Sequence, residues 1–138
     1  MPLARIDLIE GRTDEQIRAV ADAVYTALVE VFEIPERDRF QIITEHPRTR
    51  IIALDAGLGF ERTDATVMVQ IFTQTGRSVA DKQRLYAAIS TNLGNAGVRG
   101  QDVFISYIEN TSADWSFGFG QAQYVEGDLP VPGGSTAA

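Results

Sequence analysis

The sequence carries the same pattern twice, and this repeat constrains the fold more than any other feature. Residues 11–13 read Gly-Arg-Thr, and residues 76–78 read Gly-Arg-Ser. Each triplet follows a β-prone run, at residues 3–9 and 66–73, and each opens a stretch with apolar residues at helical spacing. The pattern therefore predicts a strand followed by a helix in each half of the chain.

Both predicted helices begin with residues that satisfy free backbone amides. Thr13 followed by Gln16 matches a capping box, in which the hydroxyl and the amide side chain each bond to a backbone N–H. Ser78 followed by Asp81 is a weaker version of the same pattern. The helices are therefore expected to start at these two positions.

A second β-prone run follows each predicted helix, at residues 40–44 and 103–108. Asp38 and Asp102 precede these runs at matching positions. A helix that connects two neighbouring strands implies that the strands are parallel. We therefore expect an α/β (α+β) protein, with tandem β-α-β units that form a four-stranded sheet and place two helices on one face.

A sheet covered on one face only would leave the other face bare, which favours an oligomer in which bare faces meet. Residues 1–129 are expected to form a single domain, with halves at about 2–58 and 59–126. Residues 130–138 contain two prolines and two glycines without periodicity, and they are expected to form a C-terminal tail.

Two connecting segments are harder to assign from pattern alone. Residues 46–61 are interpreted as a connection with one short strand at residues 51–54, and His46 is expected in a surface loop. Residues 115–120 alternate aromatic, serine and glycine residues and are interpreted as a turn-rich hairpin.

The composition removes several classes of chemistry. The chain has no cysteine, one histidine and a single lysine, Lys82, so thiolate nucleophiles and multi-histidine metal sites are excluded. The net charge of -7 disfavours binding to nucleic acids and anionic membranes. No apolar run reaches the roughly 20 residues of a membrane span, and the polar start does not resemble a secretory signal. A cytoplasmic protein without a metal site is expected.

Position 2 is a proline directly before the first predicted strand. Methionine is normally removed when the next residue is small, so Pro2 is expected to carry a free secondary amine. Such an amine acts as an acid, as a base, or as a nucleophile that forms an iminium ion. The alternative is an ordinary second residue without a chemical role.

Longer segments point to a family. Residues 35–38 read Pro-Glu-Arg-Asp and residues 113–118 read Ala-Asp-Trp-Ser-Phe-Gly, and these are the most specific motifs. Together with residues 7–14, residues 57–60 and the proline at position 2, they resemble the tautomerase superfamily, and within it most closely the malonate semialdehyde decarboxylases. The resemblance covers nearly the whole chain.

The resemblance implies a homotrimer and a reaction that uses no cofactor. Malonate semialdehyde, a small 3-oxo acid, would be decarboxylated to acetaldehyde and carbon dioxide, with promiscuous hydratase activity. The implied catalytic residues are Pro2, Asp38 and Arg77. The residues expected to bind the substrate are Trp115, Phe117, Thr75, Phe40, Tyr124 and Leu129.

One position departs from the family pattern. The family has two arginines before the second helix, and the earlier one falls on Thr75 in this chain. Arg39, Gln74 or a neighbouring subunit could supply the missing group. This departure keeps other functions open: a hydratase or cis-3-chloroacrylate dehalogenase, a keto–enol tautomerase, or a non-catalytic oligomeric binding protein.

Overall fold

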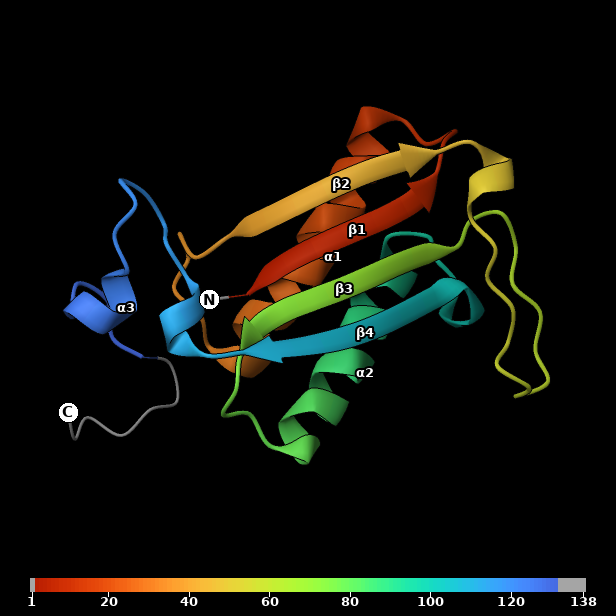
Figure 1. Ribbon diagram of the computed structural model, residues 1–138. Helices are drawn as coiled ribbons and strands as arrows, with labels where there is room; N and C mark the ends of the chain where they lie inside the picture. Colours follow the sequence, from red (N-terminus) through yellow and green to blue (C-terminus); the bar gives the residue numbers. More distant parts are fainter. Residues whose placement is uncertain (1, 132–138) are drawn as a thin grey trace.

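The computed structural model describes residues 2–131, and these form one sheet with helices on one face (Figure 1). The strands are β1 (Leu3–Ile9), β2 (Phe40–His46), β3 (Val67–Gln74) and β4 (Val103–Asn110), and the long helices are α1 (Asp14–Phe32) and α2 (Val79–Asn95). The four strands lie in the order β2-β1-β3-β4, with β1–β2 and β3–β4 parallel and β1–β3 antiparallel. The predicted tandem β-α-β architecture is confirmed. Most of the predicted C-terminal tail lies outside the described residues.

Side-chain caps start both long helices at the predicted positions. Thr13 Oγ1 accepts a hydrogen bond from the Gln16 amide at 3.2 Å, and Gln16 Oε1 accepts one from the Thr13 amide at 2.9 Å. At α2, Ser78 Oγ accepts a hydrogen bond from the Asp81 amide at 3.1 Å. Each cap satisfies an amide that the first turn of a helix leaves free. Within the described residues, no helix is long and apolar enough to cross a membrane.

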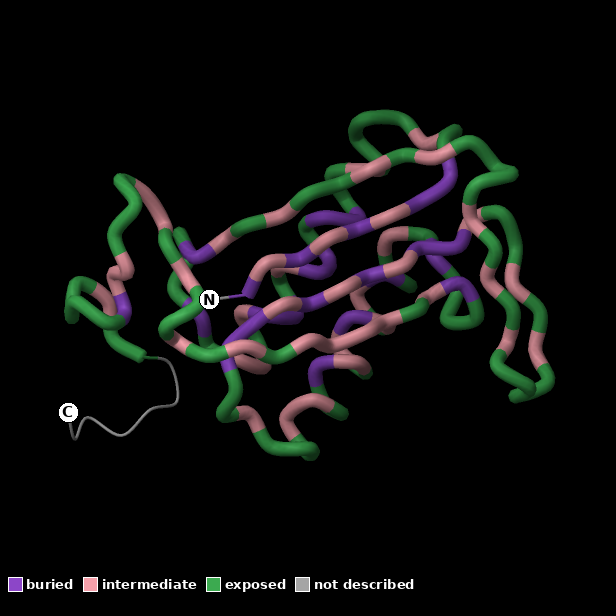
Figure 2. The backbone as a smooth tube through the Cα atoms, in the orientation of Figure 1, coloured by how far each residue is buried: buried purple, intermediate pink, exposed green. Residues whose placement is uncertain are grey.

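The core lies between the sheet and the two long helices. Successive strand residues point to opposite faces, so Ala4, Ile6 and Leu8 of β1 all face the helices, and each is fully buried. Figure 2 shows this alternation as buried segments along the central strands. The buried helix residues that meet the sheet include Val20, Val24, Leu28, Leu85, Ile89 and Leu93.

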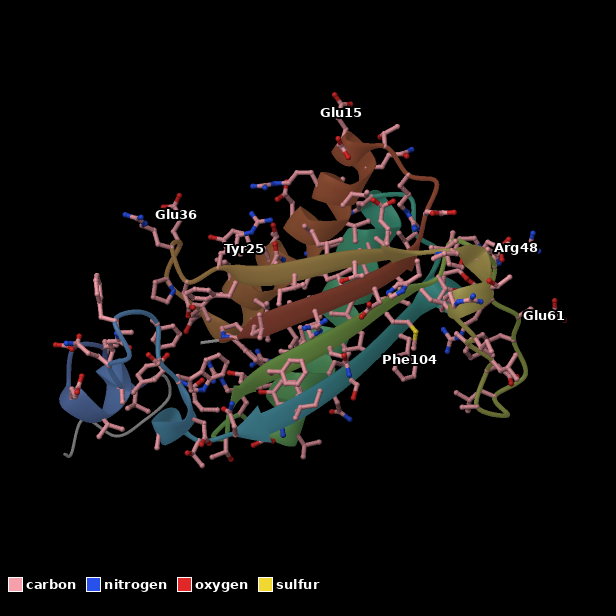
Figure 3. The ribbon with its side chains drawn as sticks, turned by 45° about the horizontal axis from the view of Figure 1, so that its top comes forward. Glu15, Tyr25, Glu36, Arg48, Glu61 and Phe104 are labelled. Carbon is pink, nitrogen blue, oxygen red and sulfur yellow. The ribbon has the colours of Figure 1, made fainter. Side chains whose placement is uncertain are left out.

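The opposite face of the sheet is bare in the single chain, as predicted. Ile42 on β2 pairs in register with Arg5, whose side chain points away from the helices. Ile42 and Phe104 are 42% and 40% exposed, and Figure 3 shows the Phe104 side chain on β4. Large apolar side chains on an uncovered sheet face indicate an interaction surface.

The connection between β2 and β3 contains no strand, so the predicted strand at residues 51–54 is wrong. A short 3₁₀ helix, Arg48–Arg50, follows β2, and the remaining connection projects beyond the end of the sheet (Figure 1). Ile52 and Leu54 are β-prone, but they are 85% and 80% exposed. No neighbouring strand in the described chain pairs with them, and β-propensity depends on such pairing.

The predicted aromatic hairpin at residues 115–120 is also wrong. This segment is irregular and leads into a short helix, α3 (Gln123–Glu126). The Gln123 side chain fixes the turn, because its Oε1 accepts a hydrogen bond from the Phe117 amide at 2.9 Å and its Nε2 donates to the Gly118 carbonyl at 3.0 Å. Side-chain bonds to the backbone replace the strand pairing that a hairpin requires.

His46 ends strand β2 and does not lie in a surface loop as predicted. Its Nε2 lies 2.6 Å from Asp7 Oδ1 on the neighbouring strand β1. The Glu10 amide also donates to the His46 carbonyl at 2.9 Å. These bonds hold the ends of β1 and β2 together, at the opposite end of β2 from Asp38.

Candidate active site

The three predicted catalytic residues lie at one edge of the sheet, that is, at one end of all four strands. Strands β1 and β2 begin at this edge, while β3 and β4 end there, because the two parallel pairs run in opposite directions. Pro2 precedes β1, Asp38 precedes β2 and Arg77 follows β3. The Thr75 amide donates to the Asn110 carbonyl at 2.8 Å and extends the β3–β4 pairing to this edge. Helix α3 lies on the same side of the molecule (Figure 1).

Asp38 places a buried carboxylate at this edge. It is 3% exposed, and neither carboxylate oxygen has a hydrogen-bond partner among the described residues. The turn before it is well anchored, because the Asp38 amide donates to the Pro35 carbonyl at 2.9 Å and the Tyr25 hydroxyl donates to the Glu36 carbonyl at 2.6 Å (Figure 3). A buried carboxylate without partners is costly, which indicates a role in binding or chemistry.

Arg77 provides a positive charge near this carboxylate. Its guanidinium carbon lies 4.6 Å from the centre of the Phe32 ring, and its Nη1 is buried without a hydrogen-bond partner in the part of the chain that the structure describes. Gly76 before it has a φ of 133°, a conformation that favours glycine.

Burial raises the pKa of Asp38, and the positive charges of the chain's amino terminus and of Arg77 oppose that shift.

Aromatic rings form an apolar wall at the same edge. Trp115 and Phe117 stack with their ring centres 5.8 Å apart, and Phe117 also contacts Phe40 at 5.6 Å and Tyr124 at 5.5 Å. Trp115 Nε1 donates to Asn110 Oδ1 at 2.9 Å, which fixes the wall to the end of β4. The structure therefore brings four of the predicted substrate-binding residues into one cluster.

A small cavity of about 170 Å³ lies between Asp38, Tyr124 and Leu129. Liquid water occupies about 30 Å³ per molecule, so the cavity suits a ligand of only a few heavy atoms. Burial raises the pKa of Tyr124, and a hydrogen bond with the Gln74 side chain opposes that shift. Within the described residues, no group of three or more His, Cys, Asp or Glu side chains could hold a metal ion. The remaining lining residues are Phe32, Glu33, Ile34, Pro35 and Pro130.

Thr75, where the family has an arginine, is already engaged. Its side chain hydrogen-bonds Glu109, and Glu109 also forms an ion pair with Lys82. Arg39, one candidate replacement, is held by Asp22 at 2.6 Å on the outer side of α1. The Thr75 side chain and the Nε and Nη2 groups of Arg39 are therefore held by other residues of the chain.

The opposite edge of the sheet provides an internal comparison, because the repeat places Asp102 where Asp38 lies in the first half. Asp102 is buried to 1% exposure, but its oxygens accept hydrogen bonds from the Thr63 amide and the Thr63 hydroxyl, both at 2.6 Å. The equivalent arginine, Arg12, donates to the Ala65 carbonyl at 2.7 Å. The fold can thus supply hydrogen-bond donors to a carboxylate at this position of the repeat. At Asp38 the described residues supply none.

Two residues of the candidate site, Phe32 and Tyr107, were not among those predicted from the sequence. Phe32 ends α1 beneath Arg77, and Tyr107 lies on β4 with a buried hydroxyl. Both residues match the apolar periodicity of their elements, so they were indistinguishable from core aromatics. The position of Tyr107 near the end of a predicted strand is the one clue that could have indicated it.

Comparison with known proteins assigns this chain to a family. A family model described as "Tautomerase enzyme" matches residues 38–118, and a second model with the same description matches residues 2–60. The probable tautomerase YrdN of Bacillus subtilis (strain 168) is 41% identical over 130 residues, which are 94% of this chain and 100% of YrdN. The chain belongs to the tautomerase superfamily.

Two solved structures confirm the resemblance seen in the sequence. The chain is similar to the FG41 malonate semialdehyde decarboxylase inhibited by 3-bromopropiolate, with 58% identity, a TM-score of 0.93 and coverage of 94% of this chain and 99% of that chain. A second malonate semialdehyde decarboxylase, studied for its decarboxylase and hydratase activities, is 37% identical with a TM-score of 0.89. That similarity covers 92% of this chain and 98% of the other.

Proposed function

We propose that this protein decarboxylates malonate semialdehyde to acetaldehyde and carbon dioxide without a cofactor, at the edge that carries Pro2, Asp38 and Arg77. The observation that carries the proposal is a pair of charged groups, the buried Asp38 carboxylate and the half-buried Arg77, each with buried atoms that have no partner among the described residues. The same edge of the sheet carries the aromatic wall, and Asp38 lines the cavity of about 170 Å³. The similarity to two malonate semialdehyde decarboxylases supports the substrate class.

The charged groups and the aromatic wall have separate roles in the proposed reaction. Arg77 binds the substrate carboxylate and holds the breaking carbon–carbon bond in a fixed orientation. When that bond breaks, its electron pair moves to the aldehyde oxygen as an enolate, and the cationic Pro2 amine stabilises the charge by a hydrogen bond. Carbon dioxide, which is neutral, leaves along the wall of Trp115 and Phe117. The enolate carbon then takes up a proton from the cationic Pro2 amine, which regains one from solvent, and this gives acetaldehyde.

Asp38 sets the state of the amine in this mechanism. A carboxylate near an amine favours the protonated amine, so Pro2 acts as a hydrogen-bond donor and acid. If Pro2 reacts while neutral, it condenses with the aldehyde, takes up a proton and releases water to form an iminium ion. The carbon–carbon bond then breaks, carbon dioxide leaves, and the electron pair moves to the iminium nitrogen to give an enamine. Protonation of the enamine carbon and hydrolysis then give the same acetaldehyde.

A hydratase is the second candidate function. Both Asp38 oxygens lack partners among the described residues, and Asp38 is one of the residues that line a cavity large enough for water molecules. A carboxylate in this position can accept a proton from a water molecule that adds to an activated double bond. The two candidate functions, decarboxylase and hydratase, use the same site and differ in the substrate supplied.

The deciding experiment is a direct assay of acetaldehyde formation from malonate semialdehyde, with mass spectrometry to confirm that the chain begins at Pro2. Pro2→Ala should lower kcat/KM by about 10²-fold or more, the usual contribution of a positioned acid. Pro47→Ala, at the opposite edge of the sheet, is the matched control and should be unchanged. Turnover by the wild type no greater than background, or unchanged turnover by Pro2→Ala, would contradict the proposal.

A further inference from the structure

Tyr107 is a buried polar group near Arg77 that the mechanism above does not use. It lies on the helix-facing side of β4, where it pairs in register with the fully buried Ile71. Its hydroxyl is buried and has no hydrogen-bond partner among residues 2–131. Removing a hydroxyl from water without a replacement bond is unfavourable, so such a group calls for an explanation.

Phe32 connects Tyr107 with Arg77. The Arg77 guanidinium carbon lies 4.6 Å from the centre of the Phe32 ring, and the Tyr107 ring meets the same ring edge-on with centres 6.3 Å apart. Burial raises the pKa of Tyr107 to about 12, and the charge of Arg77 acts in the opposite direction. The Tyr107 hydroxyl is therefore protonated at neutral pH and can donate a hydrogen bond.

The Lys82 ammonium, which lies over the Tyr107 ring, is engaged by another residue. Lys82 Nζ lies 4.7 Å from the centre of the Tyr107 ring, but its ammonium group is paired with Glu109. Glu109 also takes the hydrogen bond of Thr75. Lys82 thus packs on the face of the ring, while the hydroxyl remains available.

We propose that Tyr107 is a substrate-binding residue whose hydroxyl, together with the Arg77 guanidinium, binds the carboxylate of the substrate. Arg77 supplies the charge, and Tyr107 supplies the hydrogen bond that a second arginine would otherwise give. Two donors on different elements fix the carboxylate plane better than one, and with it the bond that breaks. The identity of the ligand as a 3-oxo acid rests on the proposed function.

Tyr107→Phe tests this role, because it removes the hydroxyl and keeps the ring against Phe32 and Lys82. Loss of a hydrogen bond to a charged group predicts a KM for malonate semialdehyde about tenfold higher. Malonate, a carboxylate without an aldehyde, should inhibit about tenfold less well, while propionaldehyde, which has no carboxylate, should inhibit as before. Tyr86→Phe on α2 is the matched control and should change none of these values.

The stability of the variant provides an independent readout. The hydroxyl has no partner among the described residues, so its removal should leave the melting temperature unchanged or higher. A lower melting temperature, unchanged malonate inhibition, or equal losses for malonate and propionaldehyde would each overturn the proposal.

Calorimetry with malonate separates this proposal from the proposed function. If the wild type binds malonate and Tyr107→Phe binds it about tenfold more weakly, the result supports the carboxylate site. If the wild type also forms no acetaldehyde, only the proposed decarboxylase activity is rejected. Equal malonate binding by the two proteins rejects the role of Tyr107 whatever the wild type does with malonate semialdehyde.

Discussion

Asp38 and Asp102 occupy equivalent positions in the repeat, yet only one of them is satisfied by its surroundings. Asp102 accepts hydrogen bonds from Thr63 and Thr66, whereas Asp38 accepts none from the described residues. Leaving a buried group of this kind unpaired costs the folded state about 1–3 kcal/mol. Asp102 thus contributes to stability, while Asp38 lowers stability and is available for a ligand.

Asp38→Asn is therefore expected to stabilise the protein at neutral pH while it lowers decarboxylase activity. Burial raises the pKa of Asp38, so the folded state disfavours its ionised form and wild-type stability falls as the pH rises above the ordinary aspartate pKa of about 3.9. The neutral amide avoids this loss. Thermal melts should show a melting temperature about 3–6 °C higher at pH 7, with the difference disappearing near pH 4.

Asp102→Asn is the matched control, with the opposite sign. It weakens hydrogen bonds from Thr63 and Thr66, so it should melt below the wild type at pH 7. An Asp38→Asn variant that also melts below the wild type would show that the Asp38 carboxylate is stabilised by its surroundings.

At the residue scale, the sequence indicated the charged groups of the candidate site better than its neutral ones. Pro2, Asp38 and Arg77 could be named because their residue types and motif positions are distinctive. Tyr107 and Phe32 could not, because an aromatic residue at strand or helix spacing reads as core. Whether the Tyr107 hydroxyl has a partner depends on side chains from β4, α1 and α2 together, and the sequence of one segment does not show this.

At the scale of elements, the two helix caps allow a paired prediction. Thr13→Ala and Ser78→Ala should each cost about 1 kcal/mol, or about 3–5 °C in melting temperature. Only Ser78→Ala should also lower kcat/KM several-fold, because Ser78 follows Arg77 directly and fixes the start of α2 beside the site. Thr13 caps α1 at the opposite edge. Equal effects of the two substitutions on kcat/KM would show that the cap does not position Arg77.

The strands and long helices were predictable, and the connections were not. Capping residues and apolar residues at helical spacing predicted α1 and α2, and β-prone runs predicted the four strands. Residues 51–54 have the composition of a strand but project beyond the sheet, where no partner strand lies in the described chain. Residues 115–120 depend on the Gln123 side chain, a contact that local pattern does not encode.

At the scale of the whole molecule, the bare sheet face leads us to expect a homotrimer, as the family resemblance implies. Ile42 and Phe104 lie on that face and are 42% and 40% exposed in the single chain. Ile42→Glu should place a charge in the interface and shift the protein to monomers in sedimentation or light-scattering measurements. Ala19→Glu, on the exposed side of α1, is the control. A monomeric wild type, or an Ile42→Glu variant of unchanged mass, would contradict the assembly.

The burial of Pro2 at the start of β1 also bears on how the protein is prepared. A purification handle joined ahead of Pro2 would convert its amine into an amide, which has no basic nitrogen and cannot carry a positive charge. The fold would be retained, since the sheet and core begin after this residue. Any handle therefore belongs at the carboxyl end, and under the proposed function the enzymatic removal of the initiator methionine would be the step that creates the reactive amine.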